Sequence, residues 1–417
     1  MFNKTVLANG VRIITESLPH SKVVSVGVWI DVGSRDEHDL NSGSAHFVEH
    51  MLFKGTARRS AQEIAREFDA LGGATNAFTT RENTCLHATV LNSNLTTVVE
   101  LFADLLCNSL FAEEEIERER QVILQEIHMV EDVPEDHIHD LFAALLWGSH
   151  PLGKTILGSS EIVGAMDAGK LRDYIQKYYT TDRIVIAAAG NVGHDDFVSL
   201  WQGAFLEYGM ISDSSLKRTT PSLLPASRRI YSRPLEQAHI IVGTYGLSAV
   251  DEDRYGYHLL NVLLGGNMSS RLFQEIREKR GLAYSIYSYI ASYSDSGYLA
   301  IYLGVDRESV NESLELVAKE MHKLQNIPAT KAELANTKDF IKSGLYLSME
   351  NMEAIMARIA KNELYFNKYI PLETVVDSIE RVSSEDILRL SAMIFGCQEI
   401  SLAGLGPLEE AVIKRKS

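Results

Sequence analysis

The pattern of hydrophobic and polar positions repeats between the two halves of the chain. Each half begins with an apolar strand, a charged segment and an apolar helix, and ends with another apolar strand. These elements span residues 24–33, 34–37, 44–53 and 184–190 in the first half, and 238–246, 251–253, 257–264 and 400–406 in the second. Strands and helices mixed in this way predict an α+β fold. We therefore expect two homologous domains joined by a linker.

A polar segment separates the two halves. Residues 209–229 carry Pro221 and Pro225, which is typical of a linker between domains. A chain of 417 residues is also too long for one ordinary core. We expect an N-terminal domain at residues 1–208 and a homologous C-terminal domain at residues 230–417.

Composition narrows the function classes. The net charge of −16 argues against nucleic-acid binding, which depends on phosphate neutralisation, and suits a cationic peptide. The sequence has no long apolar run, so we expect no membrane-spanning helix. Residues 1–18 resemble neither a signal peptide nor a transit segment. Cys85, Cys107 and Cys397 form no paired framework, and we expect a reducing, cytoplasmic location.

The strongest chemical signal is an H-x-x-E-H run in the helix expected at residues 44–53. His46 and His50 are four residues apart, so both project from one helix face and can bind one metal ion. Glu49 borders that face, within reach of a water on the metal. This order of residues is the inverzincin pattern of zinc peptidases. Ser42 or Ser44 is the expected N-cap of the helix.

A third metal ligand is expected from the acidic helix predicted at residues 112–132. Two of its glutamates, Glu119 and Glu126, are seven residues apart and lie at the edge of the apolar stripe. Helical periodicity alone does not decide which of the two glutamates is the metal ligand. The stripe consists of Ile116, Ile123, Ile127 and Val130.

Together, the H-x-x-E-H motif and the later E-R-Q-V-I-L-Q-E segment resemble the pitrilysin/insulinase family of zinc peptidases. The likeness is strongest to mitochondrial processing peptidase and its bacterial relatives, and it extends over the whole chain. It implies one Zn²⁺ per chain and domains that each contain a mostly antiparallel sheet flanked by helices. By the same resemblance, His46, His50 and Glu126 bind zinc, Glu49 is the general base, and Glu119 supports the site without binding the metal.

The Thr-rich segment at residues 76–90 alternates in polarity and predicts one strand. Gly72 and Gly73 end the preceding helix, which is expected at residues 61–71. The family resemblance implies that this strand is a sheet edge beside the zinc, to which a peptide substrate adds as a further strand. Asn76, Ala77 and Phe78 match the residues that line the substrate in that family.

Two acidic positions follow the third-ligand helix. Asp136 and Asp140 share a helix face after Pro134, which predicts the first turn of a new helix. They resemble the positions with which processing peptidases hold a basic residue near the scissile bond. A solvated acidic cluster is the alternative interpretation.

The second half has no paired-histidine motif, but it contains an Arg/Tyr pair. Arg277 and Tyr284 follow a Gly- and Ser-containing stretch at residues 264–273. The resemblance implies that they donate hydrogen bonds to the substrate backbone and stabilise the oxyanion. In family members built from two-domain subunits, such a pair serves the zinc site of the partner subunit. This chain carries both the zinc motif and the pair, so we expect a homodimer that encloses a chamber. Without the resemblance, a charged helix followed by a strand would be the simpler interpretation.

The sequence thus predicts a zinc-dependent endopeptidase that cleaves unfolded peptides or presequence-like segments, with a preference for sites next to basic residues. Zinc would activate a water, and Glu49 would accept its proton. Two alternatives come from other classes. One is a non-catalytic scaffold subunit of the same fold, and the other is a zinc hydrolase of a non-peptide substrate.

Overall fold

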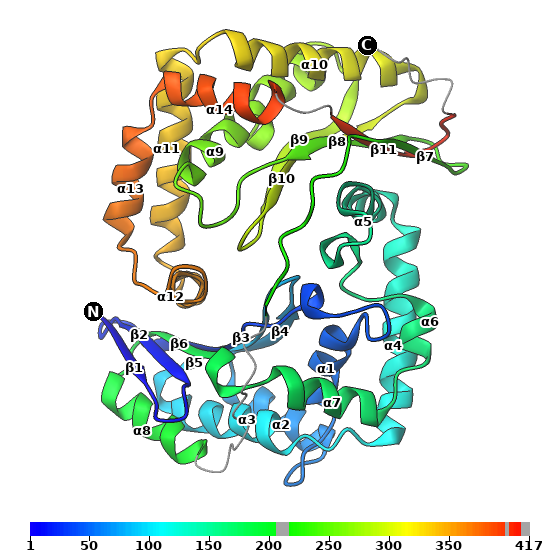
Figure 1. The fold of residues 1–417 in the computed structure, drawn as a ribbon. Coiled ribbons are helices and arrows are strands. Elements are labelled where there is room, and N and C mark those ends of the chain that lie inside the picture. Colours follow the sequence, from blue (N-terminus) through cyan, green and yellow to red (C-terminus); the bar gives the residue numbers. More distant parts are fainter. Residues whose placement is uncertain (206–216, 397–399, 410–417) are drawn as a thin grey trace. The chain divides into compact units, whose positions relative to one another are not determined.

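A computed structural model describes residues 1–205, 217–396 and 400–409. These residues contain two β-sheets, each covered by helices (Figure 1). The first sheet has the order β1-β2-β6-β3-β5-β4, and its neighbouring strands are antiparallel except for β2 and β6. Its strands are β1 (Phe2–Val6), β2 (Arg12–Ser17), β3 (Val23–Ile30), β4 (Ala74–Thr79), β5 (Thr84–Leu91) and β6 (Ile184–Gly190).

The second sheet repeats this arrangement in the order β7-β11-β8-β10-β9, and its one parallel pair is β7 and β11. From β2 in the first sheet and β7 in the second, order and direction agree strand by strand, with β1 as an addition. The predicted α+β fold with two homologous domains is therefore confirmed. The strands are β7 (Arg228–Ser232), β8 (Ala238–Tyr245), β9 (Ala283–Ser292), β10 (Gly297–Val305) and β11 (Ser401–Gly406).

The helices follow the same repeat along the chain. Those of the first half are α1 (Ser44–Leu52), α2 (Ala61–Leu71), α3 (Leu95–Asn108), α4 (Glu113–Asp132), α5 (Pro134–Trp147), α6 (Ser160–Gly164), α7 (Ala168–Tyr178) and α8 (His194–Ala204). Those of the second half are α9 (Arg254–Asn261), α10 (Val310–Asn326), α11 (Lys331–Ser348), α12 (Met352–Phe366), α13 (Leu372–Arg381) and α14 (Ser384–Gly396). Two π-helical segments, Val262–Gly266 and Phe273–Glu278, lie between α9 and β9.

The compact units of the structure are not the two continuous halves. Helix α12 of the second half packs on the first sheet, and α5 of the first half packs on the second sheet (Figure 1). The first unit contains Met1–His128, Lys154–Thr219 and Tyr346–Ile370. The predicted domain boundaries, 1–208 and 230–417, therefore miss that α5 and α12 are exchanged between the two units. The reason is that both faces of each sheet are apolar, and a strand's polarity pattern does not say which helix covers a face.

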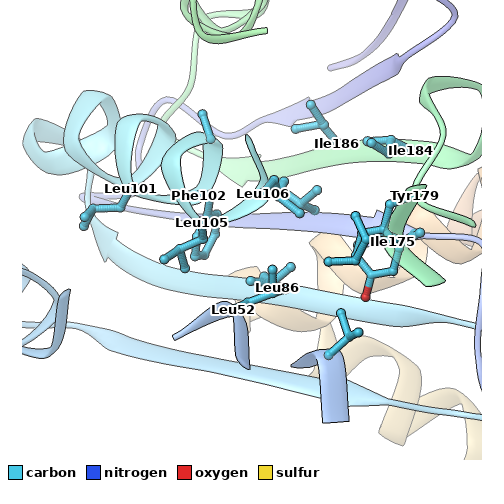
Figure 2. Close-up of a cluster of buried hydrophobic side chains, with 14 of the residues drawn as sticks. Leu52, Leu86, Leu101, Phe102, Leu105, Leu106, Ile175, Tyr179, Ile184 and Ile186 are labelled. Carbon is cyan, nitrogen blue, oxygen red and sulfur yellow. The ribbon is translucent and has the colours of Figure 1, made fainter. Parts of the chain in front are cut away.

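The core of the first unit lies between its sheet and helices α3 and α7 (Figure 2). Leu86 of β5 and Ile186 of β6 belong to one buried cluster with the apolar stripe of α3 and with Ile175 of α7. Each large side chain fully buried here contributes about 1.5–3 kcal/mol to folding. The labelled members of this cluster are Leu52, Leu86, Leu101, Phe102, Leu105, Leu106, Ile175, Tyr179, Ile184 and Ile186.

The segment predicted as one strand at residues 76–90 forms a hairpin instead. Strands β4 and β5 pair with each other, and residues 80–83 form the turn between them. The Thr80 N–H donates to the Asn83 carbonyl at 2.7 Å, and the Thr80 hydroxyl accepts from the Asn83 N–H at 2.9 Å. Residues 80–83 are four polar residues in succession, so the alternation breaks here, but no glycine or proline marks the break as a turn.

The expected linker overlaps the second sheet. Residues 209–216 lie outside the described part of the chain, residues 217–227 form neither helix nor strand, and β7 begins at Arg228. Among the described residues, no helix combines the length and the apolar character needed to cross a membrane.

Candidate metal centre

Helix α1 is positioned by a buried carboxylate rather than by a serine N-cap. Gly43 is the N-cap and makes no side-chain capping bond, so the expectation of Ser42 or Ser44 was wrong. Glu37 instead accepts hydrogen bonds from the Gly43 and Ala45 N–H groups, both at 2.7 Å. Burial raises the pKa of Glu37 to about 8, although these two N–H groups act in the opposite direction. The carboxyl group of Glu37 thus satisfies two otherwise unpaired N–H groups of the helix.

The structure brings His46 and His50 of α1 together with Glu126 of α4. One potential ligand atom from each residue lies within 4.8 Å of the others. The Nε2 atoms of His46 and His50 lie 3.6 Å and 3.8 Å from Glu126 Oε2. This oxygen is buried and has no hydrogen-bond partner among the described residues. A buried carboxylate oxygen between two imidazoles fits a cation, and two histidines with one glutamate are a ligand set of catalytic zinc.

The electrostatics around His46 favour metal binding. Burial, together with the neighbouring His50, lowers the pKa of His46 to about 4. The imidazole is therefore neutral at pH 7, as a metal ligand has to be.

Glu119 holds His50 from the side away from Glu126. Its Oε2 lies 3.0 Å from His50 Nδ1, and its Oε1 lies 2.7 Å from Lys54 Nζ. Because a carboxylate accepts hydrogen bonds, Nδ1 carries the proton and Nε2 is left free to bind a metal. Burial alone would raise the pKa of Glu119, but the hydrogen bonds from Lys54 and His50 outweigh it and lower that pKa. The two glutamates that periodicity could not separate thus occupy different positions.

Glu49 lies on α1 beside the histidines and contacts the first sheet. Its Oε2 accepts a hydrogen bond from the Thr79 hydroxyl at 2.5 Å. Burial raises the pKa of Glu49, while Thr79 acts in the opposite direction. A carboxylate with a raised pKa next to a metal site is suited to proton transfer.

The expected substrate strand is at the edge of the first sheet. β4 ends the strand order, and α1 packs beside it. Asn76 is exposed, and its Oδ1 accepts from the Ala77 N–H at 2.9 Å. Phe78 is half-buried and packs edge-on against Trp29, with ring centroids 5.5 Å apart. β4 is thus an edge strand, with one side that pairs with no other described strand.

The remaining predicted residues belong to the second unit. Arg277 lies in the π-helical segment Phe273–Glu278, and its guanidinium is 5.4 Å from the ring centre of Tyr284 on β9. The Tyr284 side chain is 77% exposed, so its hydroxyl is accessible. Asp136 is exposed on α5, which begins at Pro134 as predicted, and Asp140 is half-buried.

Sequence reasoning missed three residues that contact the site. They are Glu37 at the start of α1, Lys54 beside Glu119, and Thr79 beside Glu49. Lys54 directly follows the metal helix, so its charge offered a weak signal. Glu37 and Thr79 gave none, because each reaches α1 from a different segment of the chain.

Comparison with known proteins agrees with this geometry. Residues 12–160 match the model of "Insulinase (Peptidase family M16)", and residues 165–340 match "Peptidase M16 inactive domain". An uncharacterized zinc protease of Streptomyces coelicolor is 38% identical over 99% of this chain and 91% of its own length. Another from Bacillus subtilis is 39% identical, with 98% of each chain covered.

A solved structure extends the likeness to the fold. A protease from Helicobacter pylori is 22% identical and superposes with a TM-score of 0.90 over 98% of this chain and 99% of its own. The description of the model that matches residues 165–340 agrees with the absence of a paired-histidine motif from the second half of the sequence. The chain belongs to the insulinase family of peptidases, family M16.

Proposed function

We propose that this chain is a zinc endopeptidase that cleaves unfolded peptides or presequence-like segments. The observation that carries the proposal is the grouping of His46, His50 and Glu126 within 4.8 Å, with Glu49 on the same helix as the histidines. These three residues would hold the zinc ion. When bound, zinc lowers the pKa of a water ligand and polarises the peptide carbonyl.

The protein's own residues supply the proton transfers. Glu49 accepts the proton of the attacking water on its carboxylate and then returns it to the amine that leaves. Glu119 keeps the proton of His50 on Nδ1, so that Nε2 faces the metal position. The hydrogen bond from Thr79 leaves Glu49 Oε1 for the proton.

The substrate is proposed to bind as an added strand on β4. Its backbone would pair along Asn76, Ala77 and Phe78, since an edge strand offers unpaired N–H and C=O groups. Unfolded segments can do this because their backbone groups are free, whereas those of folded substrates are already paired.

The second unit is proposed to contribute to substrate binding. Arg277 and Tyr284 would donate to the substrate backbone and to the developing oxyanion. Asp136 and Asp140 would favour a basic side chain near the scissile bond. Their acidic charge and the exposure of Tyr284 support these roles.

We further propose a homodimer located in the cytoplasm. One chain carries both the metal group and the Arg/Tyr pair, so two copies suffice to build every part of the site. Cys85 is a buried free thiol, which suits a reducing compartment. Sedimentation of the purified protein tests the oligomeric state.

Zinc content and cleavage of a quenched basic peptide, measured side by side, test the proposal. We expect wild type to bind zinc and cleave the peptide. Glu49→Gln should keep the zinc while turnover falls about 10²- to 10⁴-fold, because only the proton acceptor is removed. Bound zinc without cleavage of peptides, but with cleavage of an ester panel, would replace the peptidase with another hydrolase. Absence of both zinc and cleavage would favour a scaffold subunit.

A further inference from the structure

Thr79 joins the edge strand of the first sheet to the metal helix. It is the last residue of β4, and its hydroxyl donates to Glu49 Oε2 at 2.5 Å. Within the described residues, this hydroxyl is the one hydrogen-bond donor to the Glu49 carboxylate. A glutamate side chain has several rotamers, so a single fixed donor decides where its carboxylate points.

The hairpin holds Thr79 itself in place. Thr79 pairs with Thr84, whose side chain is fully buried and donates to the Val32 carbonyl at 3.1 Å. In the turn, Glu82 is buried and forms a 2.7 Å ion pair with Arg35, which is buried as well. The hydroxyl is therefore presented by a rigid strand end rather than by a mobile loop.

The geometry of the contact suits a general base. With Oε2 occupied by Thr79, the lone pairs of Oε1 remain for the proton of the attacking water. We propose that Thr79 is a positioning residue for Glu49, which fixes the carboxylate in the orientation that accepts this proton. The inference rests on the proposed function, because it assigns a role within the same reaction.

The position of Thr79 also connects substrate binding to catalysis. Residues 76–78 of β4 are the proposed docking positions for the substrate backbone, and Thr79 directly follows them on the same strand. A peptide added to this edge and the carboxylate of Glu49 are thus aligned by one rigid element. Small misplacements of a catalytic group can cost about 100-fold in rate.

Three variants test the role of Thr79. Thr79→Val keeps the shape of the side chain and removes the donor, while Thr79→Ser restores the hydroxyl. Thr89→Val is the matched control, because Thr89 of β5 donates to the Ser25 hydroxyl at 3.0 Å in the same sheet. Each protein is assayed with zinc and the quenched basic peptide for kcat, KM and zinc affinity.

We expect Thr79→Val to lower kcat about 10- to 100-fold, with KM and zinc affinity changed by less than about twofold. Thr79→Ser should recover kcat to within about threefold of wild type, and Thr89→Val should match wild type. In a Glu49→Gln background, Thr79→Val should cause no further loss, because the group that it positions is already absent. A Thr79→Val protein as active as Thr89→Val, a loss of zinc, or additive losses in the double variant would overturn the proposal.

A measurement without turnover separates this inference from the proposed function. Unfolding midpoints of the metal-free Thr79→Val, Glu49→Ala and double variants form a double-mutant cycle, because alanine removes the acceptor that glutamine would keep. A double variant no less stable than the weaker single variant supports the contact, and additive shifts overturn it. If wild type cleaves no peptide, the proposed function fails and the positioning role in catalysis fails with it, while the cycle still reports the contact.

Discussion

The two units of this protein share a sheet order, yet among the residues that the structure describes only those of the first bring together a group able to bind a metal. In each unit a helix follows the corresponding central strand, α1 after β3 and α9 after β8. Helix α1 carries His46, Glu49 and His50, whereas α9 is held in its core by the fully buried Tyr257. The same fold thus supports catalysis or packing according to a few side chains on one helix.

The helices that supply the acidic residues differ in a similar way. Helix α4 follows α3 in the first half, and α11 follows α10 in the second. Glu126 of α4 faces the two histidines, while Glu333 of α11 forms a 3.0 Å ion pair with Arg271. A carboxylate paired with an arginine is already neutralised and has little to offer a metal ion. The comparison teaches that a glutamate can serve as a metal ligand where it faces imidazoles, as Glu126 does, but not where an arginine already pairs with it, as Arg271 does with Glu333.

Removing one histidine from each unit should give the largest contrast. We expect His50→Ala to lose zinc, because the two remaining ligands are too few to hold the metal. Its rate of peptide cleavage should fall to the detection limit. His258→Ala, on α9, should keep both zinc and activity. Metal analysis and the quenched-peptide assay measure the two effects. Equal losses in the two variants would remove the asymmetry between the units.

A second test asks whether the second unit takes part in the reaction. Tyr284→Phe should lower kcat about 100-fold through loss of one oxyanion donor, with zinc content unchanged. The control is Tyr255→Phe, since Tyr255 also stacks with an arginine, Arg254, whose guanidinium lies 4.4 Å from its ring centre. Steady-state kinetics of the two variants and wild type measure kcat and test this prediction. An unchanged kcat in Tyr284→Phe would confine the chemistry to the first unit.

The support of His50 by Glu119 predicts an effect on the metal itself. Glu119→Ala should weaken zinc binding about 10- to 100-fold, because Nδ1 loses the acceptor that fixes the tautomer of His50. Glu117→Ala on the same helix, where the glutamate is exposed and pairs with Arg120, should not change zinc affinity. Competition with a zinc chelator measures both constants. Equal affinities would show that the Glu119 contact does not tune the metal.

The smallest expected effect is a pH dependence of the metal-free protein. The pKa of His46 is lowered from 6.5 to about 4, so between these values the unfolded chain binds a proton that the folded chain does not. Stability is therefore full above about pH 6.5 and falls as the pH decreases towards 4. Between pH 7 and pH 5 wild type should lose about 2 kcal/mol more than His46→Gln. Urea unfolding at the two pH values measures this difference, and parallel losses would contradict it.

Local spacing made much of the site predictable. The positions of His46 and His50 in one helix follow from the four-residue spacing, and α2, β6 and α4 lie within a residue or so of their predicted ranges. The repeat of the two halves was also readable, since apolar strands and helices recur in the same order. Periodicity narrowed the third ligand to two glutamates without choosing between them.

Contacts between distant segments were not predictable in this way. The hydrogen bond from Thr79 to Glu49 depends on how a hairpin packs beside a helix, and the turn at residues 80–83 contains no glycine or proline to mark it. The N-terminus of α1 was expected to be capped by a serine, but a carboxylate from a preceding turn reaches it instead. In both contacts the two residues come from different segments of the chain, so the sequence around either residue does not reveal the other.

By itself, the sequence determined the α+β class, the internal repeat and the paired histidines, because each depends on local spacing and periodicity, and its motifs carried the resemblance to the insulinase family. The family resemblance implied different roles for Glu126 and Glu119, and the tertiary structure shows Glu126 facing the histidines while Glu119 holds His50. Only the tertiary structure decided that α5 and α12 are exchanged between the sheets. These outcomes depend on which surfaces meet when apolar faces are buried. The polarity pattern of a helix or strand shows which of its faces is buried, but not which other element packs against that face.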